Sequence, residues 1–142
     1  MSVPKVKTSD IAARRNTTIM ASPTKVNPDD LELLSDKIKD ADDKAVTMLL
    51  QKTPLLVHAQ TKHGFTPLYL AAMKPERMNC LRAILKHTPP IDEKGDDKET
   101  PLYIAVFNNN IDAVRTLIAA GAKVNEINGI DGETALGCAA RL

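Results

Sequence analysis

The sequence predicts an all-α fold in which short helix–turn–helix units stack side by side. Nearly the same nine letters occur three times: GFTPLYLAA from Gly64, KETPLYIAV from Lys98 and GETALGCAA from Gly132. The copies begin at equal intervals, which we call the repeat period, and apolar residues recur at helical spacing after the first two. A fixed period of this length is typical of repeat proteins, in which each unit packs only against its neighbours.

Composition limits the classes of protein to which the chain can belong. Its 142 residues and 43% hydrophobic content fit one small folded domain. The formal net charge of +1 gives no general attraction to nucleic acids or acidic membranes, so nucleic-acid binding is not expected. The two cysteines make no disulfide framework, and neither a membrane span nor a secretory signal is evident. We therefore expect a monomer in the cytoplasm, with the nucleus as an alternative.

Residues 1–27 are expected to form a disordered basic arm, because they are rich in Ser, Thr and Pro and lack a sustained apolar period. This segment contains one acidic residue, Asp10, and five basic residues: Lys5, Lys7, Arg14, Arg15 and Lys25. Whether this arm is phosphorylated or acts as a targeting signal stays open.

The ordered part is expected to begin with a pair of helices. Asn27 can cap a helix that has Pro28 at its first position, and Leu31, Leu34 and Ile38 then follow at helical spacing. A polar turn at residues 40–43 leads to a second apolar stripe made by Ala45, Val46, Leu49 and Leu50.

The same plan returns after Thr66 and Thr100, each of which can cap a helix whose first residue is proline. In each case a second apolar stripe follows: Met78, Cys80, Leu81, Ile84 and Leu85, and then Ile111, Val114, Leu117 and Ile118. Gly121 lies where a helix that ends in a left-handed residue favours glycine.

This pattern resembles the ankyrin repeat, an extended turn and two antiparallel helices of about 33 residues with the signature T-P-L-H-x-A. The signature is written T-P-L-Y-L-A from Thr66, T-P-L-Y-I-A from Thr100 and T-A-L-G-C-A from Thr134. The resemblance covers residues 28–142. It implies repeats at 28–60, 61–93 and 94–127, with a partial fourth repeat at 128–142.

Departures from the family pattern carry expectations of their own. Tyr69, Tyr103 and Gly137 replace the signature histidine, so polar contacts between repeats should be weaker or rearranged. The repeat period is one position longer than the family's, which implies an extra residue in each hairpin loop. Lys98 replaces the turn glycine, so the third hairpin should differ in shape. The first unit lacks the signature altogether.

The last copy stops inside its first helix, which leaves Leu136, Cys138 and Ala139 without an expected covering helix. We therefore expect an N-terminal part of a longer protein; the alternative is a short chain whose end is covered by a partner.

Chemistry-bearing residues do not form a recognisable catalytic set. His58, His63 and His87 lie outside metal-ligand spacing, and Cys80 and Cys138 fall at apolar helix positions. No phosphate-binding loop is present, and the acids at residues 92–99 lie on one polar loop. The sequence indicates no enzyme, cofactor, metal or small-molecule substrate. Asn125 resembles the asparagine that is hydroxylated in this family, and whether it is modified stays open.

An array of this kind offers a concave surface with hairpin tips along its rim. The resemblance implies that a partner protein contacts the residues beside each turn and after each signature. These are Lys62, His63, Phe65, Met73, Lys74, Asp96, Asp97, Glu99, Phe107, Asn108, Ile130, Asp131 and Glu133, with Arg141 as a further candidate.

We therefore expect a protein–protein interaction module. The alternative is the targeting domain of an enzyme or bacterial-type effector whose catalytic domain lies beyond residue 142. A third reading, a nucleic-acid or membrane binder led by the basic arm, is disfavoured by the net charge.

Overall fold

A computed structural model of the chain describes residues 26–129 and 131–142. Its α-helices are α1 (Pro28–Lys39), α2 (Asp43–Lys52), α3 (Pro67–Ala72), α4 (Met78–Leu85), α5 (Pro101–Phe107), α6 (Ile111–Ala119) and α7 (Ala135–Arg141). Two 3₁₀ helices, η2 (Pro54–His58) and η3 (Pro75–Arg77), lie in the connections. The predicted all-α fold is confirmed. The arm predicted for residues 1–27 falls almost wholly outside the described residues.

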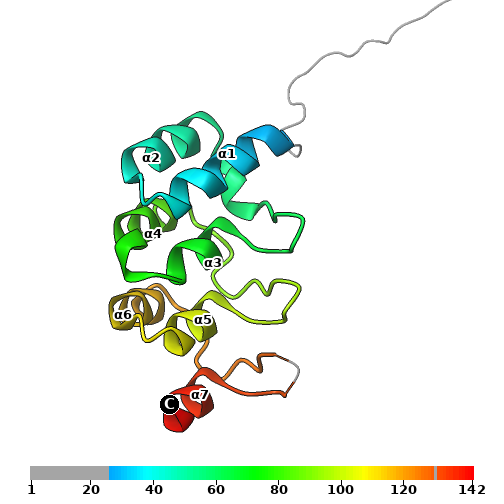
Figure 1. Cartoon of the computed structure of the whole chain (residues 1–142), viewed down its shortest axis with the longest axis vertical. Coiled ribbons are helices and arrows are strands. Elements are labelled where there is room, and N and C mark those ends of the chain that lie inside the picture. Colours follow the sequence, from blue (N-terminus) through cyan, green and yellow to red (C-terminus); the bar gives the residue numbers. More distant parts are fainter. Residues whose placement is uncertain (1–25, 130) are drawn as a thin grey trace, which may run out of the picture.

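The helices form two parallel columns (Figure 1). The inner column contains α1, α3, α5 and α7, and the outer column contains α2, α4 and α6. Hairpin loops project beside the inner column, and the second, third and fourth hairpins are those that lead into α3, α5 and α7. We call the successive helix pairs the first, second and third units and α7 the beginning of a fourth; a junction is the contact between neighbouring units.

Each inner helix begins where its capping residue satisfies a free backbone N–H. The Asn27 side chain accepts a hydrogen bond from the Asp29 amide at 2.9 Å. The hydroxyls of Thr66, Thr100 and Thr134 accept from the amide at the third position further on, at 3.2, 3.2 and 3.0 Å. The capping predicted from the sequence is therefore confirmed, and it fixes the start of each inner helix.

The core runs through all the junctions as one apolar cluster. Leu34, Leu68 and Leu102 take equivalent positions in successive inner helices, and all three are buried. Buried Ala71 and Ala105 are small enough to let neighbouring inner helices approach closely. Burial of these aliphatic side chains, rather than the helix propensity of such short segments, stabilises the stack.

The third hairpin does not differ in backbone shape as the sequence predicts. Lys98 has φ +61°, close to the +78° of Gly64 and the +70° of Gly132. The carbonyl of Lys98 accepts a hydrogen bond from the amide of Gly129 in the next hairpin at 2.8 Å. Within its own hairpin, the Lys98 amide donates to the Gly95 carbonyl at 2.9 Å, as the Gly64 amide donates to the Thr61 carbonyl at 2.8 Å. The hairpin therefore keeps its turn although lysine disfavours the left-handed conformation by about 1–2 kcal/mol.

Two of the four apolar residues predicted for the core in α6 are exposed instead. Ile111 and Ile118 are 54% and 46% exposed, because within the described residues no outer helix packs beyond α6. In α7, Leu136 is 72% exposed, whereas Cys138 is fully buried against the third unit. Of the α7 residues expected to lack cover, Leu136 and Ala139 are exposed and Cys138 is not.

The capping threonines are equally spaced, but the spacing of the helices within a unit differs between the second and third units. Counted from its capping threonine, buried Ile84 of the second unit comes one position later than its equivalent in the third unit, Leu117. The second unit therefore carries its extra residue between its two helices, in η3, and not in the hairpin loop where the sequence predicts it. The third unit carries its extra residue after α6, in the hairpin loop that leads to α7.

Candidate functional site

Two of the three junctions are bridged by a tyrosine and a glutamate. The Tyr103 hydroxyl lies 2.9 Å from Glu133 Oε2, and the Tyr69 hydroxyl lies 3.4 Å from Glu99 Oε2. In both cases the tyrosine comes from one unit and the glutamate from the next hairpin. These tyrosine–glutamate bridges are the rearranged polar contacts that replacement of the signature histidine predicts.

The first junction has neither member of such a bridge. Ser35 stands one repeat period before Tyr69, and Phe65 stands one repeat period before Glu99. The Ser35 hydroxyl donates within its own helix, to the Leu31 carbonyl at 2.9 Å. Phe65 stacks on Tyr69 with ring centroids 4.8 Å apart and planes 1° apart. A small side chain thus replaces a large one where α1 faces the next hairpin.

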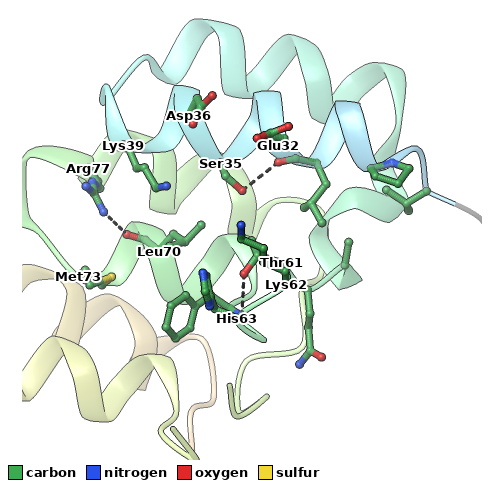
Figure 2. A pocket seen from close by; sticks show the side chains of 16 residues that line it. Glu32, Ser35, Asp36, Lys39, Thr61, Lys62, His63, Leu70, Met73 and Arg77 are labelled. Carbon is green, nitrogen blue, oxygen red and sulfur yellow. Dashed lines mark hydrogen bonds between the residues drawn. The ribbon is translucent and has the colours of Figure 1, made fainter. Parts of the chain in front are cut away.

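A groove of about 850 Å³ opens at this position. Figure 2 shows it between α1, α3 and the second hairpin. Its volume is within the roughly 300–1,000 Å³ of typical ligand clefts. The lining residues are Val26, Pro28, Leu31, Glu32, Ser35, Asp36, Lys39, Ala59, Gln60, Thr61, Lys62, His63, Phe65, Leu70, Met73 and Arg77.

Four of the residues predicted to contact a partner meet in this groove: Lys62, His63, Phe65 and Met73. Lys62 and His63 are exposed at the hairpin tip, whereas Phe65 and Met73 are half-buried and pack against the core. Lys74 is exposed next to Met73 but does not line the groove.

The other predicted residues lie along the lower units. Asp96, Asp97 and Asp131 are exposed near hairpin tips, and Phe107 and Asn108 are exposed at the end of α5. Glu99 and Glu133 belong to the tyrosine–glutamate bridges. Ile130 lies outside the described residues.

Electrostatics distinguish the two bridging glutamates. Hydrogen bonds from Arg141 and then Tyr103 lower the pKa of Glu133 to about 2. At Glu99, burial, followed by repulsion from Asp97, raises the pKa of the carboxyl above its ordinary value. Burial and the bond to Glu133 raise the pKa of Tyr103 to about 12, so its hydroxyl stays protonated and remains a donor at neutral pH.

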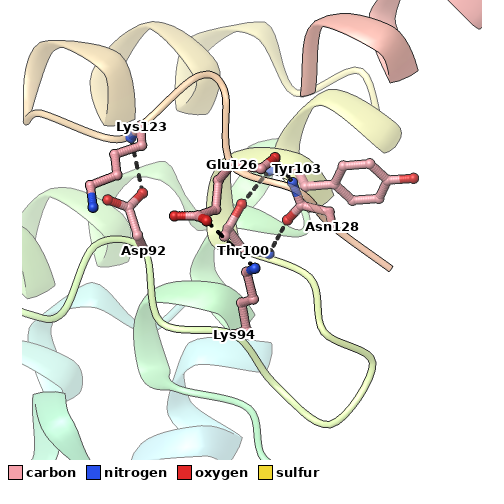
Figure 3. Close-up of polar contacts among 7 residues, drawn as sticks. All are labelled: Asp92, Lys94, Thr100, Tyr103, Lys123, Glu126 and Asn128. Carbon is pink, nitrogen blue, oxygen red and sulfur yellow. Dashed lines mark hydrogen bonds and ion pairs between the residues drawn. The ribbon is translucent and has the colours of Figure 1, made fainter. Parts of the chain in front are cut away.

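Further polar contacts join the third and fourth hairpins (Figure 3). The Thr100 amide donates to Asn128 Oδ1 at 2.7 Å, and the Lys123 amide donates to Asp92 Oδ1 at 3.0 Å. An ion pair of 3.6 Å joins Lys94 and Glu126. These contacts hold the base of the acidic hairpin in place and leave its tip exposed.

Comparison with known proteins agrees with this architecture. Residues 34–128 match the model of a family described as ankyrin repeats, in three copies. The chain belongs to the ankyrin repeat family. Ankyrin repeats are generally non-catalytic modules for protein–protein interaction, and the family resemblance drawn from the sequence is thus confirmed.

Relatives of this ankyrin array are much longer proteins. The chain is 33% identical over 87 residues to Ankyrin repeat and SOCS box protein 2 of Bos taurus, covering 61% of the chain and 13% of that protein. It is 30% identical over 83 residues to Putative ankyrin repeat protein FPV024 of Fowlpox virus (strain NVSL), covering 58% and 14%. Putative palmitoyltransferase ZDHHC13 of Danio rerio is 32% identical over 103 residues, covering 64% and 16%. The match thus spans only a small part of each of these relatives.

Sequence reasoning missed the first repeat's share of the groove. Leu31, Ser35 and Lys39 come from α1, which lacks the signature from which the other positions were assigned. Ser35 and Lys39 stand one repeat period before Tyr69 and Met73. The repeat period alone would therefore have identified them. Leu70 and Arg77 are not at the family positions from which the partner-contacting residues were predicted.

Other kinds of site find no support in the part of the chain that the structure describes. No group of three or more His, Cys, Asp or Glu side chains there could hold a metal ion. Across the same residues, no helix combines the length and the apolar character needed to cross a bilayer.

Proposed function

We propose that the groove between the first and second ankyrin repeats binds a segment of a partner protein. The observation that carries the proposal is the replacement of a tyrosine–glutamate pair by Ser35 and Phe65, which leaves the concave face open at this junction. Half-buried Phe65 and Met73 supply apolar surface for a hot spot, and exposed Lys62 and His63 supply a polar rim.

The test fills the groove from Ser35, a buried residue whose equivalent in the second repeat, Tyr69, is also buried. Ser35→Tyr places at the first junction the residue that the second and third repeats carry. The matched control is Thr116→Tyr, because the Thr116 hydroxyl likewise donates to a carbonyl one helical turn earlier, that of Asp112 at 2.7 Å, but lies on α6 away from the groove. Circular dichroism and thermal unfolding check that both variants keep the fold.

Both variants and the unchanged chain are then used for affinity capture from host lysate. We expect Ser35→Tyr to lose the captured partner and Thr116→Tyr to retain it. Capture that is equal for all three chains would mean that the partner does not enter the groove.

We propose in addition that the acidic tip of the third repeat contributes to the rim. Asp96 and Asp97 are exposed, whereas Glu99 is bonded to Tyr69, so charge reversal is best confined to the two aspartates. Asp96→Lys with Asp97→Lys should weaken binding of the captured partner and leave circular dichroism unchanged. Unchanged affinity would remove this tip from the interface.

An alternative is that the array targets an attached catalytic domain. The matching segment is a small part of the relatives above, and one of them is named as a palmitoyltransferase. We propose on this ground that the chain is the N-terminal part of a longer protein; the full-length gene decides the point. Two free, buried cysteines, Cys80 and Cys138, support an intracellular setting, cytoplasmic or nuclear.

A further inference from the structure

Arg77 occupies a position that caps the outer helix in the neighbouring repeats. Asp42 and Asn110 stand immediately before α2 and α6, and their side chains accept from the amides of Ala45 and Ala113 at 3.1 and 3.4 Å. Arg77 stands at the same place before α4 and makes no side-chain cap, because a guanidinium has no acceptor. The second repeat therefore forgoes a cap at this position.

The Arg77 side chain lines the groove but is largely withdrawn from water. It is 9% exposed, and its Nη1 donates to the Leu70 carbonyl at 2.8 Å. Within residues 26–129 and 131–142 the ion pairs are Lys94–Glu126 and Arg141–Glu133, so no carboxylate of the described residues pairs with Arg77. Desolvation lowers the pKa of Arg77, against a smaller rise caused by the charge of the adjacent Glu76. A buried cation without an anionic partner is costly, and an anion supplied from outside would offset that cost.

Lys39 lines the same groove from α1, and Figure 2 shows its side chain descending towards Leu70. The carboxylates of Glu32 and Asp36 also belong to the lining. Cations therefore exceed acids among the charged groups of the groove, but only slightly. This balance fits a ligand that brings one negative charge, and it disfavours a phosphate or a nucleic-acid backbone, which Glu32 and Asp36 would repel.

The floor beside Arg77 is apolar. Leu70 is buried, and Phe65 and Met73 are half-buried and line the groove beside it. An apolar side chain bound here would lie next to the guanidinium. A ligand with both an apolar group and a carboxylate would match the two parts of the site.

On the basis of the proposed function, we infer that Arg77 and Lys39 form a subsite for a carboxylate of the partner segment. The partner is a peptide that carries an Asp or Glu close to a bulky apolar residue. The carboxylate pairs with the Arg77 guanidinium, and the apolar residue packs on Phe65, Leu70 and Met73. Arg77 suits this role because its planar donors match a carboxylate in a bidentate manner.

A display library of random linear peptides tests the inference with the whole chain as bait. We expect the selected peptides to share a bulky apolar residue and an Asp or Glu at a fixed separation. Replacement of that acid by Asn or Gln in a selected peptide should weaken binding by about ten- to a hundredfold, the equivalent of about 1.4–2.8 kcal/mol, because a hydrogen-bonded charge is lost. This measurement leaves the protein unchanged and so does not depend on the folding of any variant.

Arg77→Gln is the matching change in the protein, because glutamine keeps a donor for the Leu70 carbonyl. Against this variant, the acidic peptide and its amide counterpart should bind with nearly equal affinity, while the preference for the apolar residue persists. Arg77→Lys should restore part of the preference for the acid, as a point charge without the bidentate geometry. Thermal unfolding checks that each variant is folded.

The outcomes separate this inference from the proposed function. Peptides that depend on the groove, and are lost in Ser35→Tyr, but show no preference for an acid would overturn the carboxylate subsite and leave the groove as a binding site. An acid preference that survives in Arg77→Gln would also overturn the subsite. Selected peptides that bind Ser35→Tyr as well as the unchanged chain would contradict the proposed function itself.

Discussion

The first junction of the array and the two junctions below it share a core but differ at the surface above it. In all three, the equivalent leucines Leu34, Leu68 and Leu102 are buried. Above the leucines, Tyr69 and Tyr103 reach across to a glutamate of the next hairpin, whereas Ser35 reaches only back along its own helix. The groove lies where the smaller Ser35 takes the place of a tyrosine.

The comparison separates what stabilises the stack from what shapes its concave face. Core positions repeat because every unit must bury the same apolar surface against its neighbours. The position of Ser35 and Tyr69 is buried in both repeats, but the size of its side chain differs, so the surface above the leucines can differ between junctions. Substitutions in the leucine layer should therefore have larger effects on stability than substitutions in the bridges above it.

Leu102→Ala removes a member of the buried layer that all junctions share. It should destabilise the fold by about 2–5 kcal/mol, because a buried leucine is replaced by a smaller side chain that leaves a cavity. Urea denaturation measures the loss. Leu136→Ala is the control, since Leu136 is 72% exposed, and it should change stability by about 0.5 kcal/mol or less. Equal losses for the two variants would show that the core is wrongly assigned.

Tyr103→Phe removes the hydroxyl of the lower bridge and should cost about 1 kcal/mol. Tyr69→Phe should cost less, because its hydroxyl lies 3.4 Å from Glu99, compared with 2.9 Å between Tyr103 and Glu133. Denaturation curves of the two variants rank the bridges. A larger loss for Tyr69→Phe would contradict the ranking drawn from these distances.

The double variant Ser35→Tyr with Phe65→Glu rebuilds a tyrosine–glutamate bridge at the first junction. Its stability should exceed the sum of the two single changes by about 0.5–1 kcal/mol, the contribution of the hydrogen bond that only the double variant can form. A double-mutant cycle of unfolding free energies measures the coupling. Additive effects would mean that the first junction differs from the others in backbone geometry as well.

The smallest expected effect is a loss of stability at acidic pH. The pKa of Glu133 is about 2 in the folded chain and ordinarily 4.5, so its bonds to Arg141 and Tyr103 stabilise the fold above pH 4.5. That contribution should be lost as the pH falls from about 4.5 to 2, and Glu133→Gln should remove this part of the acid dependence.

Ionisation of Glu99 should have the opposite effect on the stability of the fold. Because folding raises its pKa, ionisation of Glu99 opposes folding, and Glu99→Gln should preserve or slightly increase stability at neutral pH. Unfolding curves collected from strongly acidic to neutral pH compare the two variants with the unchanged chain. The same pH profile for both variants would contradict the difference between the bridges.

Most of the stack follows from local rules that can be read in the sequence. Capping residues, first-turn prolines and apolar spacing predict where α1, α3 and α5 begin, and the repeat period aligns the buried leucines. The backbone at Lys98 could not be predicted in this way, because hydrogen bonds of its own turn and to the next hairpin accompany a conformation that the residue type disfavours. The exposure of Ile111 likewise depends on which helices lie beside α6.

The groove was predicted only in part. Lys62, His63, Phe65 and Met73 were found from the family pattern, which places variable residues beside each turn and after each signature. Ser35 was missed because its importance lies in being smaller than Tyr69, which only a comparison between repeats reveals. Arg77 was missed because the extra residue before it shifts the second repeat against the period.

The tyrosine–glutamate pairs lie above a leucine layer that all the junctions share, so the shape of the concave face is set at each junction by its own pair. Exchange of Tyr69 or Tyr103 for serine would open the concave face at a lower junction too, with a loss of buried contact and of the hydrogen bond to the next hairpin. The side chain at this one position of each inner helix therefore affects both the shape of the concave face and the stability of the junction beneath it.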